Sequence, residues 1–393
     1  MRFREAQRVA AFGTTVFSEF SRLANEHQAV NLGQGFPDFD GPPEVKQAAL
    51  DAINGGLNQY AMGHGAPKLR EAIATHARRF YDQAVDPNSM VCVTSGATEA
   101  IFDAALALLD PGDEAVVFEP FYDSYVAAIQ MACATPRHVR LFPPDARHPA
   151  WWFDESELAA AFCERTRLVF VNTPHNPTGK VFTRDELQLI GALATKHDAI
   201  VLSDEVYEHL VFAPARHIRI ATLPGLADRT LTLSSGGKSF SFTGWKIGWA
   251  IGPAPLIKAV QKAHQWVTFA TASPLQAAIA TALTLPDSYF DGFALMYRAK
   301  RDLLCDALSR AGLTPLVPEG AYFVIARTDS RLKDHPDDFA FCRWLTTKGG
   351  VAAIPPSAFY SDAHKAEARA LARFAFCKTD PVLLEAARRL SAL

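Results

Sequence analysis

The chain has 393 residues, of which 49% are hydrophobic, so it is long enough for about two domains with sizeable cores. Its 42 acidic and 39 basic residues nearly cancel, which excludes the basic surplus that attracts nucleic acids and anionic membranes. No apolar run predicts a membrane span, and the charged start, residues 1–8, differs from a signal peptide. We therefore expect a cytoplasmic protein that binds a small uncharged or zwitterionic ligand, without a nucleic-acid or membrane partner.

Six cysteines occur, and none of them forms a C-x-x-C pair. The spacing therefore predicts no metal site and no redox pair. Most of these residues lie in apolar surroundings and are expected to be buried thiols, which fits a reducing compartment.

The first ninety residues combine helices with a shaped loop. Helices are expected at 15–27, 43–53 and 67–80. Between the first two lies Asn31-Leu-Gly-Gln-Gly-Phe-Pro-Asp-Phe-Asp40, which contains two glycines, a proline and no helical period. Because a simple connector seldom exposes two phenylalanines, we expect this loop to line a pocket.

From about residue 90 the pattern is that of an α/β protein. Apolar strands are predicted at 90–94, 114–118, 139–142, 168–171, 199–203 and 230–233, with helices at 99–109 and 184–196. Strands that are apolar on both faces favour a sheet covered by helices on both sides. A further strand at 249–252 follows a short turn, which favours an antiparallel direction.

The C-terminal third has a different pattern, typical of a second, α+β domain. It predicts a long helix at 287–312, a strand at 321–325, a helix at 337–349, a strand at 372–376 and a last helix at 381–393. No internal repeat or low-complexity linker is present.

Polar residues follow the predicted strands, at the edge where parallel sheets bind ligands. Ser95-Gly-Ala-Thr98 opens a helix and could bind an anion, although a capping role explains it equally well. Tyr122 offers a flat face for a heterocycle, but a core aromatic is the simpler interpretation. Asn172-Thr-Pro-His-Asn-Pro-Thr-Gly179 is a rigid loop that presents two amides, and turn chemistry alone explains part of it.

Two later strands end in ionisable side chains. A buried carboxylate such as Asp204 needs a cationic partner, for which a protonated pyridine nitrogen is one candidate and a helix N-terminus another. Lys238 follows two glycines and can condense with an aldehyde to a Schiff base. The alternative is a glycine-rich loop with two solvated lysines. Phosphate cradle, ring stack, carboxylate and amine together are typical of pyridoxal 5′-phosphate binding.

These motifs resemble the fold-type I, class I and II aminotransferases over nearly the whole chain. The resemblance is strongest to the branch that holds kynurenine aminotransferases, glutamine transaminase K and bacterial methionine aminotransferases. It implies an α/β fold of the aspartate aminotransferase type, in which a mainly parallel sheet is sandwiched by helices beside a smaller α+β domain. The expected divisions are an N-terminal arm at 1–41, a large cofactor domain at 42–285 and a small domain at 286–393. The resemblance also implies a homodimer with shared active sites.

The resemblance assigns roles residue by residue. Lys238 is the expected Schiff-base lysine and proton carrier, Asp204 the partner of the ring nitrogen, and Tyr207 a donor to the ring hydroxyl. Arg373 is expected to clamp the substrate carboxylate, with Arg369 as the competing choice. The other expected cofactor contacts are Ser95, Gly96, Ala97, Thr98, Tyr122, Asn172, Asn176, Ser235, Lys246 and, from the other subunit, Tyr60. The other expected substrate contacts are Gly35, Phe36, Phe17 and Asn176.

The implied activity is transfer of an amino group from an apolar, sulfur-containing or aromatic L-amino acid to a 2-oxoacid by a ping-pong mechanism. Methionine, phenylalanine, glutamine and kynurenine are the expected donors, because no second arginine is evident for a distal carboxylate. A cysteine-S-conjugate β-lyase using the same lysine is the alternative. A cofactor-binding regulator is disfavoured by the short, non-basic N-terminal segment, and a nicotinamide dehydrogenase by the lack of G-x-G-x-x-G.

Overall fold

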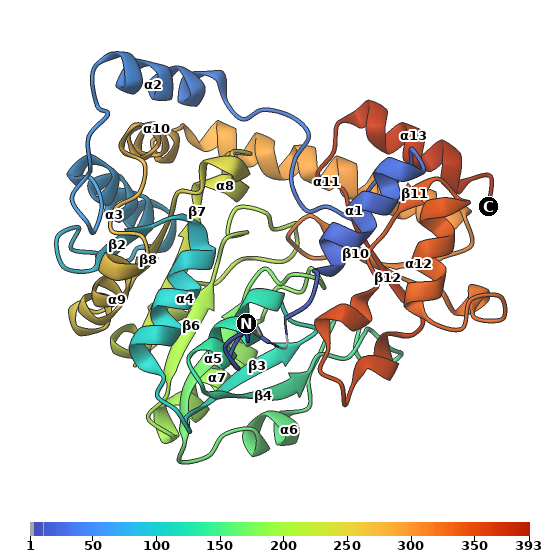
Figure 1. Cartoon of the computed structure of the whole chain (residues 1–393), viewed down its shortest axis with the longest axis horizontal. Coiled ribbons are helices and arrows are strands. Elements are labelled where there is room, and N and C mark those ends of the chain that lie inside the picture. Colours follow the sequence, from blue (N-terminus) through green and yellow to red (C-terminus); the bar gives the residue numbers. More distant parts are fainter. Residues whose placement is uncertain (1–3, 11) are drawn as a thin grey trace.

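The computed structural model describes residues 4–10 and 12–393, so part of the charged start, residues 1–3, lies outside the described residues. A seven-stranded sheet forms the centre, in the order β2-β8-β7-β6-β5-β3-β4 (Figure 1). Its strands are β2 (Val91–Thr94), β3 (Glu114–Glu119), β4 (Thr135–Arg140), β5 (Thr166–Asn172), β6 (Ile200–Asp204), β7 (Thr230–Ser235) and β8 (Gly248–Ile251). Strand β8 runs antiparallel to both of its neighbours, β2 and β7, which confirms the direction expected for that strand.

Helices cover both faces of this sheet because successive strand residues point to opposite sides. Val117 of β3 packs in the core beneath α4 (Gly96–Leu108), α5 (Asp123–Met131) and α9 (Ala254–Val267). Its neighbour Val116 packs in the opposite core, beneath α6 (Glu155–Ala160) and α7 (Arg184–Lys196). The edge formed by β2 and β8 packs in a further core with α2 (Pro43–Asn54), α3 (Pro67–Tyr81) and α10 (Ser273–Leu283).

The C-terminal third and the N-terminal arm pack together. An antiparallel sheet has the order β12 (Leu371–Ala375), β10 (Phe323–Arg327), β9 (Thr314–Leu316), and β1 (Val30–Asn31) pairs in parallel with β11 (Val351–Ala352). The helices here are α1 (Val16–Glu26), α11 (Asp287–Arg310), α12 (Asp338–Thr347) and α13 (Asp380–Leu390). In Figure 1 the blue α1 lies among the orange and red C-terminal elements, and Phe20 shares a core with Phe341 and Phe374.

Several predicted boundaries were wrong for local reasons. The strand expected at 139–142 is β4, which begins at Thr135, because an edge strand with alternating exposed polar residues hides its apolar signal. Strand β10 begins at Phe323 rather than 321, since Ala321 has a φ of 58°. The helix expected at 99–109 begins earlier, at Gly96, as α4.

Short 3-10 helices complete the chain at Ile220–Thr222, Ala227–Arg229, Thr243–Trp245, Asp329–Arg331, Pro356–Phe359 and Lys365–Ala368. Among the described residues, no helix combines the length and apolar character needed to cross a bilayer.

Candidate active site

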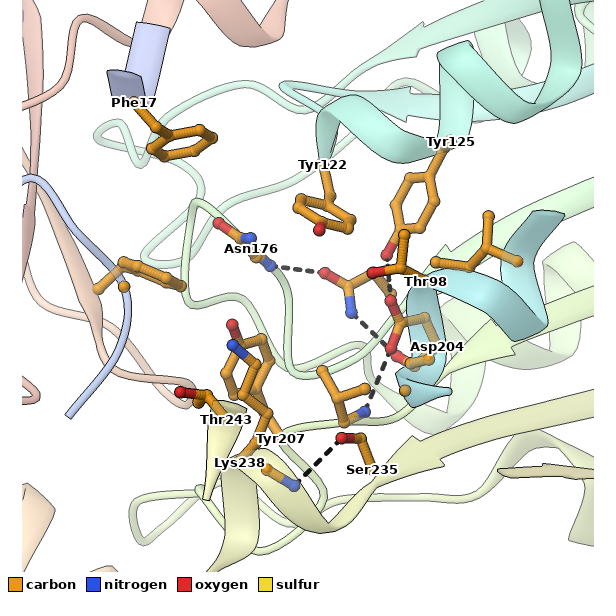
Figure 2. A pocket seen from close by; sticks show the side chains of 18 of the residues that line it. Phe17, Thr98, Tyr122, Tyr125, Asn176, Asp204, Tyr207, Ser235, Lys238 and Thr243 are labelled. Atoms are coloured by element: carbon orange, nitrogen blue, oxygen red, sulfur yellow. Dashed lines mark hydrogen bonds between the residues drawn. The ribbon is translucent and has the colours of Figure 1, made fainter. Parts of the chain in front are cut away.

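A cavity of about 310 Å³ opens at the carboxyl ends of β5, β6 and β7, between the central sheet and the C-terminal elements (Figure 2). Most of the predicted site residues line it. These are Phe17, Gly35, Gly96, Ala97, Thr98, Tyr122, Asn172, Asn176, Asp204, Tyr207, Ser235, Lys238, Lys246 and Arg373. The sheet topology therefore gathers side chains that are more than 350 residues apart in sequence around one space.

Lys238 lies in a four-residue helix, α8 (Gly236–Ser239), which directly follows β7. The helix is capped by Ser235, whose hydroxyl accepts a hydrogen bond from the Gly237 N–H at 3.1 Å. The lysine Nζ donates to the Tyr322 hydroxyl at 2.9 Å, and that hydroxyl donates to the Gly35 carbonyl at 2.6 Å. Burial lowers the pKa of Lys238 to about 8, so a useful fraction of the amine is neutral and nucleophilic near neutral pH.

Asp204 ends β6 and faces the same cavity. Its Oδ2 accepts a hydrogen bond from the Tyr125 hydroxyl at 2.6 Å, and its Oδ1 accepts one from the Val206 N–H at 3.2 Å. Burial raises the pKa of Asp204, while the hydrogen bond from Tyr125 and the charge of Lys238 act in the opposite direction. A buried carboxylate held in this way can pair with a protonated heterocyclic nitrogen.

The predicted rigid loop after β5 is tied to the end of β6. The Asn172 Nδ2 donates to the Asp204 carbonyl at 2.9 Å, and the Asn172 Oδ1 accepts from the Asn176 N–H at 2.6 Å. Asn172 therefore fixes the loop, and Asn176 is carried to the wall of the cavity.

An anion cradle closes the other end of the cavity. The first turn of α4 has no side-chain cap, so the N–H groups of this turn remain available at the positive end of the helix. Gly96 has a φ of 76°, and an added Cβ there would lie 3.2 Å from the Lys246 Nζ. A Cβ on Gly248 would lie 2.5 Å from the Gly96 carbonyl carbon. These close backbone approaches leave a space bounded by amides and one ammonium group, which suits a phosphate.

Arg373 lies on β12 and is only 1% exposed. Its Nη2 donates to the Gly33 carbonyl at 2.7 Å and its Nη1 to the Asn176 Oδ1 at 3.4 Å, while its Nε has no hydrogen-bond partner. The guanidinium lies 4.4 Å from the Phe323 ring centroid and, within residues 4–10 and 12–393, forms no ion pair. Burial lowers its pKa to about 10. An unpaired buried fork of this kind is a ready site for a carboxylate.

Three predicted residues do not line the cavity. The Ser95 side chain is half-buried outside the lining, and Phe36 is 45% exposed beneath the Lys378 ammonium. Tyr60 is 82% exposed, with its ring edge-on to Phe269 at 5.2 Å. Arg369, the competing carboxylate ligand, is exposed and also lies outside the lining.

Sequence reasoning missed several lining residues. Tyr125 lies on α5, three positions after the N-cap residue Tyr122. Residues three apart share a helix face, so this spacing could have indicated that Tyr125 also faces the cavity. Tyr322, which is not a lining residue but accepts a hydrogen bond from the Lys238 amine, was also missed, because the stretch that contains it showed only an apolar pattern. The other lining residues that were missed are Gln34, Ile101, Val206, Gly237, Thr243 and Phe323.

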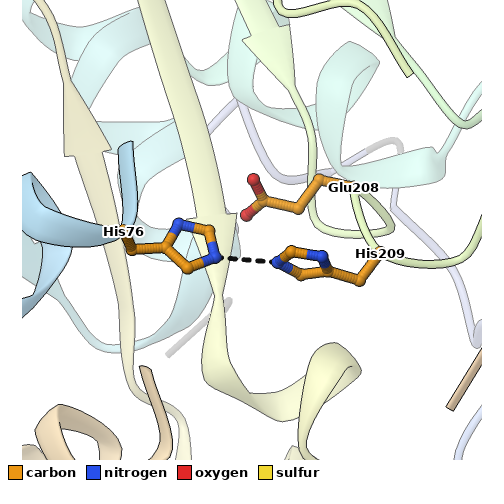
Figure 3. Close-up of side chains that lie close together, drawn as sticks. All are labelled: His76, Glu208 and His209. Carbon is orange, nitrogen blue, oxygen red and sulfur yellow. Dashed lines mark hydrogen bonds between the residues drawn. The ribbon is translucent and has the colours of Figure 1, made fainter. Parts of the chain in front are cut away.

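A second buried polar cluster involves the residues that follow Asp204, and Figure 3 shows three of its members, His76, Glu208 and His209. Arg219 donates to Glu205 at 3.0 Å and to Glu208 at 2.7 Å. His76 and His209 approach one another at 2.7 Å through their Nε2 atoms, a hydrogen-bond distance. Burial lowers the pKa of the two rings to about 4 and about 3, so both are neutral near pH 7. The cluster is therefore best described as a hydrogen-bonded scaffold for the turn that carries the site.

Comparisons with known proteins agree with this geometry. The family model for aminotransferase class I and II matches residues 27–390. A probable N-succinyldiaminopimelate aminotransferase of Mycobacterium tuberculosis is 47% identical, with 98% of each chain covered. A kynurenine–oxoglutarate transaminase of Dictyostelium discoideum is 40% identical, with 98% of this chain and 95% of that protein covered. The solved structure of an Escherichia coli methionine aminotransferase is 40% identical and superposes with a TM-score of 0.93, with 100% of each chain covered.

Proposed function

The chain belongs to the class I and II aminotransferases, which are pyridoxal phosphate-dependent enzymes, and we propose that its amino donors are amino acids with a single carboxylate. The preferred side chains are apolar, sulfur-containing or aromatic, as in methionine, phenylalanine and kynurenine, or a neutral amide, as in glutamine. The acceptor is a 2-oxoacid. Relatives named for kynurenine and for methionine lie at 40% and 42% identity, which supports this choice.

One observation carries the substrate class. Among the described residues that line the cavity, three side chains are cationic: Lys238, Lys246 and Arg373. The two lysines belong to the part of the cavity that suits the cofactor, which leaves one arginine for one carboxylate. The wall next to Arg373 is aromatic, because the Phe17 and Phe323 ring centroids lie 5.1 and 4.4 Å from the guanidinium carbon. A second, distal carboxylate would enter this wall without a cationic partner, which costs free energy.

The cavity has residues suited to each polar group of the cofactor, and we assign these residues as follows. Lys246, Ser235 and the first turn of α4 hold the phosphate, Tyr122 stacks on the ring, and Asp204 keeps the ring nitrogen protonated. Tyr207 and Asn176 donate to the ring hydroxyl. When bound, pyridoxal 5′-phosphate supplies a sink for the electrons released when the substrate Cα loses its proton.

The side chains of this protein perform the binding and proton-transfer steps. Arg373 fixes the substrate carboxylate through two parallel hydrogen bonds, with Asn176 and Gly35 beside it. That contact orients the Cα–H bond toward Lys238. The neutral amine of Lys238 acts as a general base when it removes the Cα proton. It then acts as a general acid when it returns that proton to a different carbon atom of the reacting molecule. The Tyr322 hydroxyl, 2.9 Å from Nζ, positions the amine between these steps.

A donor panel tests the substrate assignment. The purified holoenzyme is assayed with methionine, phenylalanine, glutamine, kynurenine and aspartate against one 2-oxoacid. We expect kcat/KM for the first four donors to exceed that for aspartate by at least about tenfold, the discrimination that one unpaired buried charge supplies. Arg373→Lys is the matched control, since it weakens the α-carboxylate contact for every donor equally. Faster turnover of aspartate, or of a donor with a distal carboxylate, would refute the assignment.

The M. tuberculosis relative favours a second candidate donor, an N-succinylated diamino acid with distal carboxylates. Such a donor needs a further cation, which a partner subunit would have to supply. A β-lyase activity on cysteine S-conjugates remains a prediction, for which pyruvate release without an added oxoacid is the readout.

The assembly and domain division are also part of the proposal. The segments around Tyr60 and Phe269 expose large apolar side chains, and the rings of these two residues are in edge-on contact. The other exposed apolar side chains of the two segments are Met62, Trp266 and Val267. A homodimer that buries this surface would bring Tyr60 to the phosphate of the partner site. We propose an arm at 1–41, a large domain at 42–285 and a small domain at 286–393, which the core shared by Phe20 and Phe374 supports. Cytoplasmic location remains a prediction.

A further inference from the structure

A buried histidine outside the cavity joins two parts of the chain that the proposed reaction needs. His264 lies near the end of α9, with its side chain 1% exposed. Its Nδ1 is 2.7 Å from the Glu99 Oε1, and its Nε2 is 2.6 Å from the Gly63 carbonyl oxygen. A carbonyl and a carboxylate both accept hydrogen bonds, so each ring nitrogen has to donate one, and the ring carries both protons.

The partner of this ring is an ionised carboxylate. Burial alone would raise the pKa of Glu99, but hydrogen bonds from His264, Thr268 and the Ser95 N–H hold it below its usual value. Burial acts to lower the pKa of His264, but the hydrogen bond and charge of Glu99 outweigh burial and raise it. The geometry and the electrostatics therefore agree on a buried imidazolium–carboxylate pair.

This pair connects two functional segments. On one side, Glu99 lies in the first turns of α4 and its other oxygen accepts from the N–H of Ser95, the residue that precedes the proposed phosphate cradle. On the other side, Gly63 belongs to the loop that carries Tyr60. The same loop is anchored by the Ser273 hydroxyl, which donates to the Gln59 carbonyl at 2.5 Å.

Glu99, Asp103 and His264 could also be interpreted as a metal site, because their potential ligand atoms lie within 4.8 Å of one another. A histidine ligand needs a lone pair on a ring nitrogen, and here both nitrogens face acceptors. Both Asp103 oxygens are buried without a hydrogen-bond partner, and one of them lies 3.8 Å from the His264 Nδ1. Burial raises the pKa of this carboxyl to about 8. Asp103 is therefore mostly neutral at pH 7, which leaves one charge of each sign in the group.

We infer that His264 is a positioning residue, a buried imidazolium that with Glu99 fixes the first turn of α4 against the Gly63 loop and so holds the phosphate cradle in shape. The inference depends on the proposed placement of the cofactor phosphate at α4, and it is independent of the amino donor. The pair acts on the cradle through the Ser95 backbone and touches neither substrate nor cofactor.

A pH dependence follows, and the groups that face His264 define it. Glu99 and Asp103 face it from α4 and His64 faces it from the loop, while Cys92 of β2 lies near the two carboxyl groups. Burial raises the pKa of the Cys92 thiol, and burial followed by the charges of Arg70 and His264 lowers that of His64. Because the pKa of His264 is raised, the ring loses its second proton only on the alkaline side, and one of its two hydrogen bonds is then lost. Asp103 ionises near pH 8, and its negative charge shifts that loss to higher pH. Cofactor affinity conferred by the pair is present below that pKa and declines above it.

The test compares pyridoxal 5′-phosphate with pyridoxal, which lacks the phosphate. The dissociation constant of each is measured spectroscopically for the wild type, His264→Gln and Glu99→Gln, from pH 6 to pH 9. We expect either substitution to weaken binding of the phosphorylated cofactor by about tenfold. Pyridoxal affinity and, at saturating cofactor, the KM of the amino donor should stay unchanged. His148→Gln, at an exposed histidine bonded to Asp145, is the matched control.

Two results would overturn the inference. The first is equal weakening of both ligands, which would mean a general structural defect. The second is an alkaline decline in cofactor affinity at the same pH in Glu99→Gln as in the wild type, because without the carboxylate charge the decline should move to lower pH. If His264→Gln does not fold, the pH dependence of cofactor affinity in Glu99→Gln and in the wild type still tests the inference. A failed donor panel would leave these measurements unaffected, so the two proposals can fail separately.

Discussion

Replacing Arg373 by methionine should strongly impair catalysis while leaving the stability of the fold nearly unchanged. The side chain is the only unpaired cation that we assign to the substrate carboxylate. A hydrogen bond to a charged group is worth roughly 1.5–3 kcal/mol, so losing two of them costs about 3–6 kcal/mol. We therefore expect kcat/KM to fall by at least about a hundredfold, with the loss in every donor alike.

Two opposing effects determine the change in stability. Burial lowers the pKa of Arg373 from 12.5 to about 10, and one pKa unit corresponds to about 1.4 kcal/mol. At pH 7, below both values, the folded state therefore carries a desolvation penalty of about 3 kcal/mol, and this penalty declines only above pH 10. Methionine relieves the penalty but loses the charged donors to Gly33 and Asn176, which are worth at least about 1.5 kcal/mol each. The two effects nearly cancel, so we expect the free energy of unfolding to change by less than about 2 kcal/mol.

The assay pairs steady-state kinetics with denaturant unfolding of the wild type, Arg373→Met and Arg373→Lys. Lysine keeps a buried charge without the fork, so it should lose activity and gain no stability. The reasoning would fail if Arg373→Met kept kcat/KM within tenfold of the wild type. It would also fail if that variant were destabilised by more than about 2 kcal/mol, because packing would then outweigh the desolvation of the charge.

Three further outcomes are expected. In cofactor-free protein, acylation of Lys238 should become half-maximal near pH 8, as its lowered pKa of about 8 requires, and labelling only above pH 10 would contradict its burial. Tyr125→Phe removes a hydrogen bond that lowers the pKa of Asp204, so the acidic limb of kcat/KM should move to higher pH and activity should fall about tenfold; an unmoved limb would disprove the contact. Gly248→Ala places a Cβ 2.5 Å from the Gly96 carbonyl carbon and should destabilise the protein by about 1–3 kcal/mol. The variant should also release cofactor in equilibrium dialysis. Gly244→Ala is the control, because an added Cβ there would meet nothing within 4 Å.

Much of the central sheet could be predicted because its strands are short apolar runs separated by helical periods. Their order could not be read from that pattern, since β8 is inserted between β2 and β7 although it follows both in sequence. The edge strand β4 was misplaced because its residues alternate between exposed and half-buried, with polar side chains outward. A hydrophobic pattern marks a strand only where its side chains are buried, and few side chains of β4 are buried.

The candidate site was largely predictable for a different reason. Asp204, Asn172 and Lys238 sit in short polar motifs after apolar strands, where the fold leaves few structural roles for them. Tyr322 was missed because it lies in an apolar stretch, and only the three-dimensional structure brings its hydroxyl to the lysine. The Glu99–His264 pair was likewise invisible, since the two residues are 165 positions apart in sequence.

The pairing of β1 with β11 has a consequence during synthesis. Val30 leaves the ribosome early, yet its strand partner Val351 is made about 320 residues later, which at roughly 5–20 residues per second is a delay of about a quarter of a minute to one minute. Throughout that interval the amphipathic α1 has its apolar face uncovered, because Phe20 packs against residues still to be translated. During synthesis the amino-terminal segment therefore exposes apolar surface that can aggregate until the C-terminal elements are made.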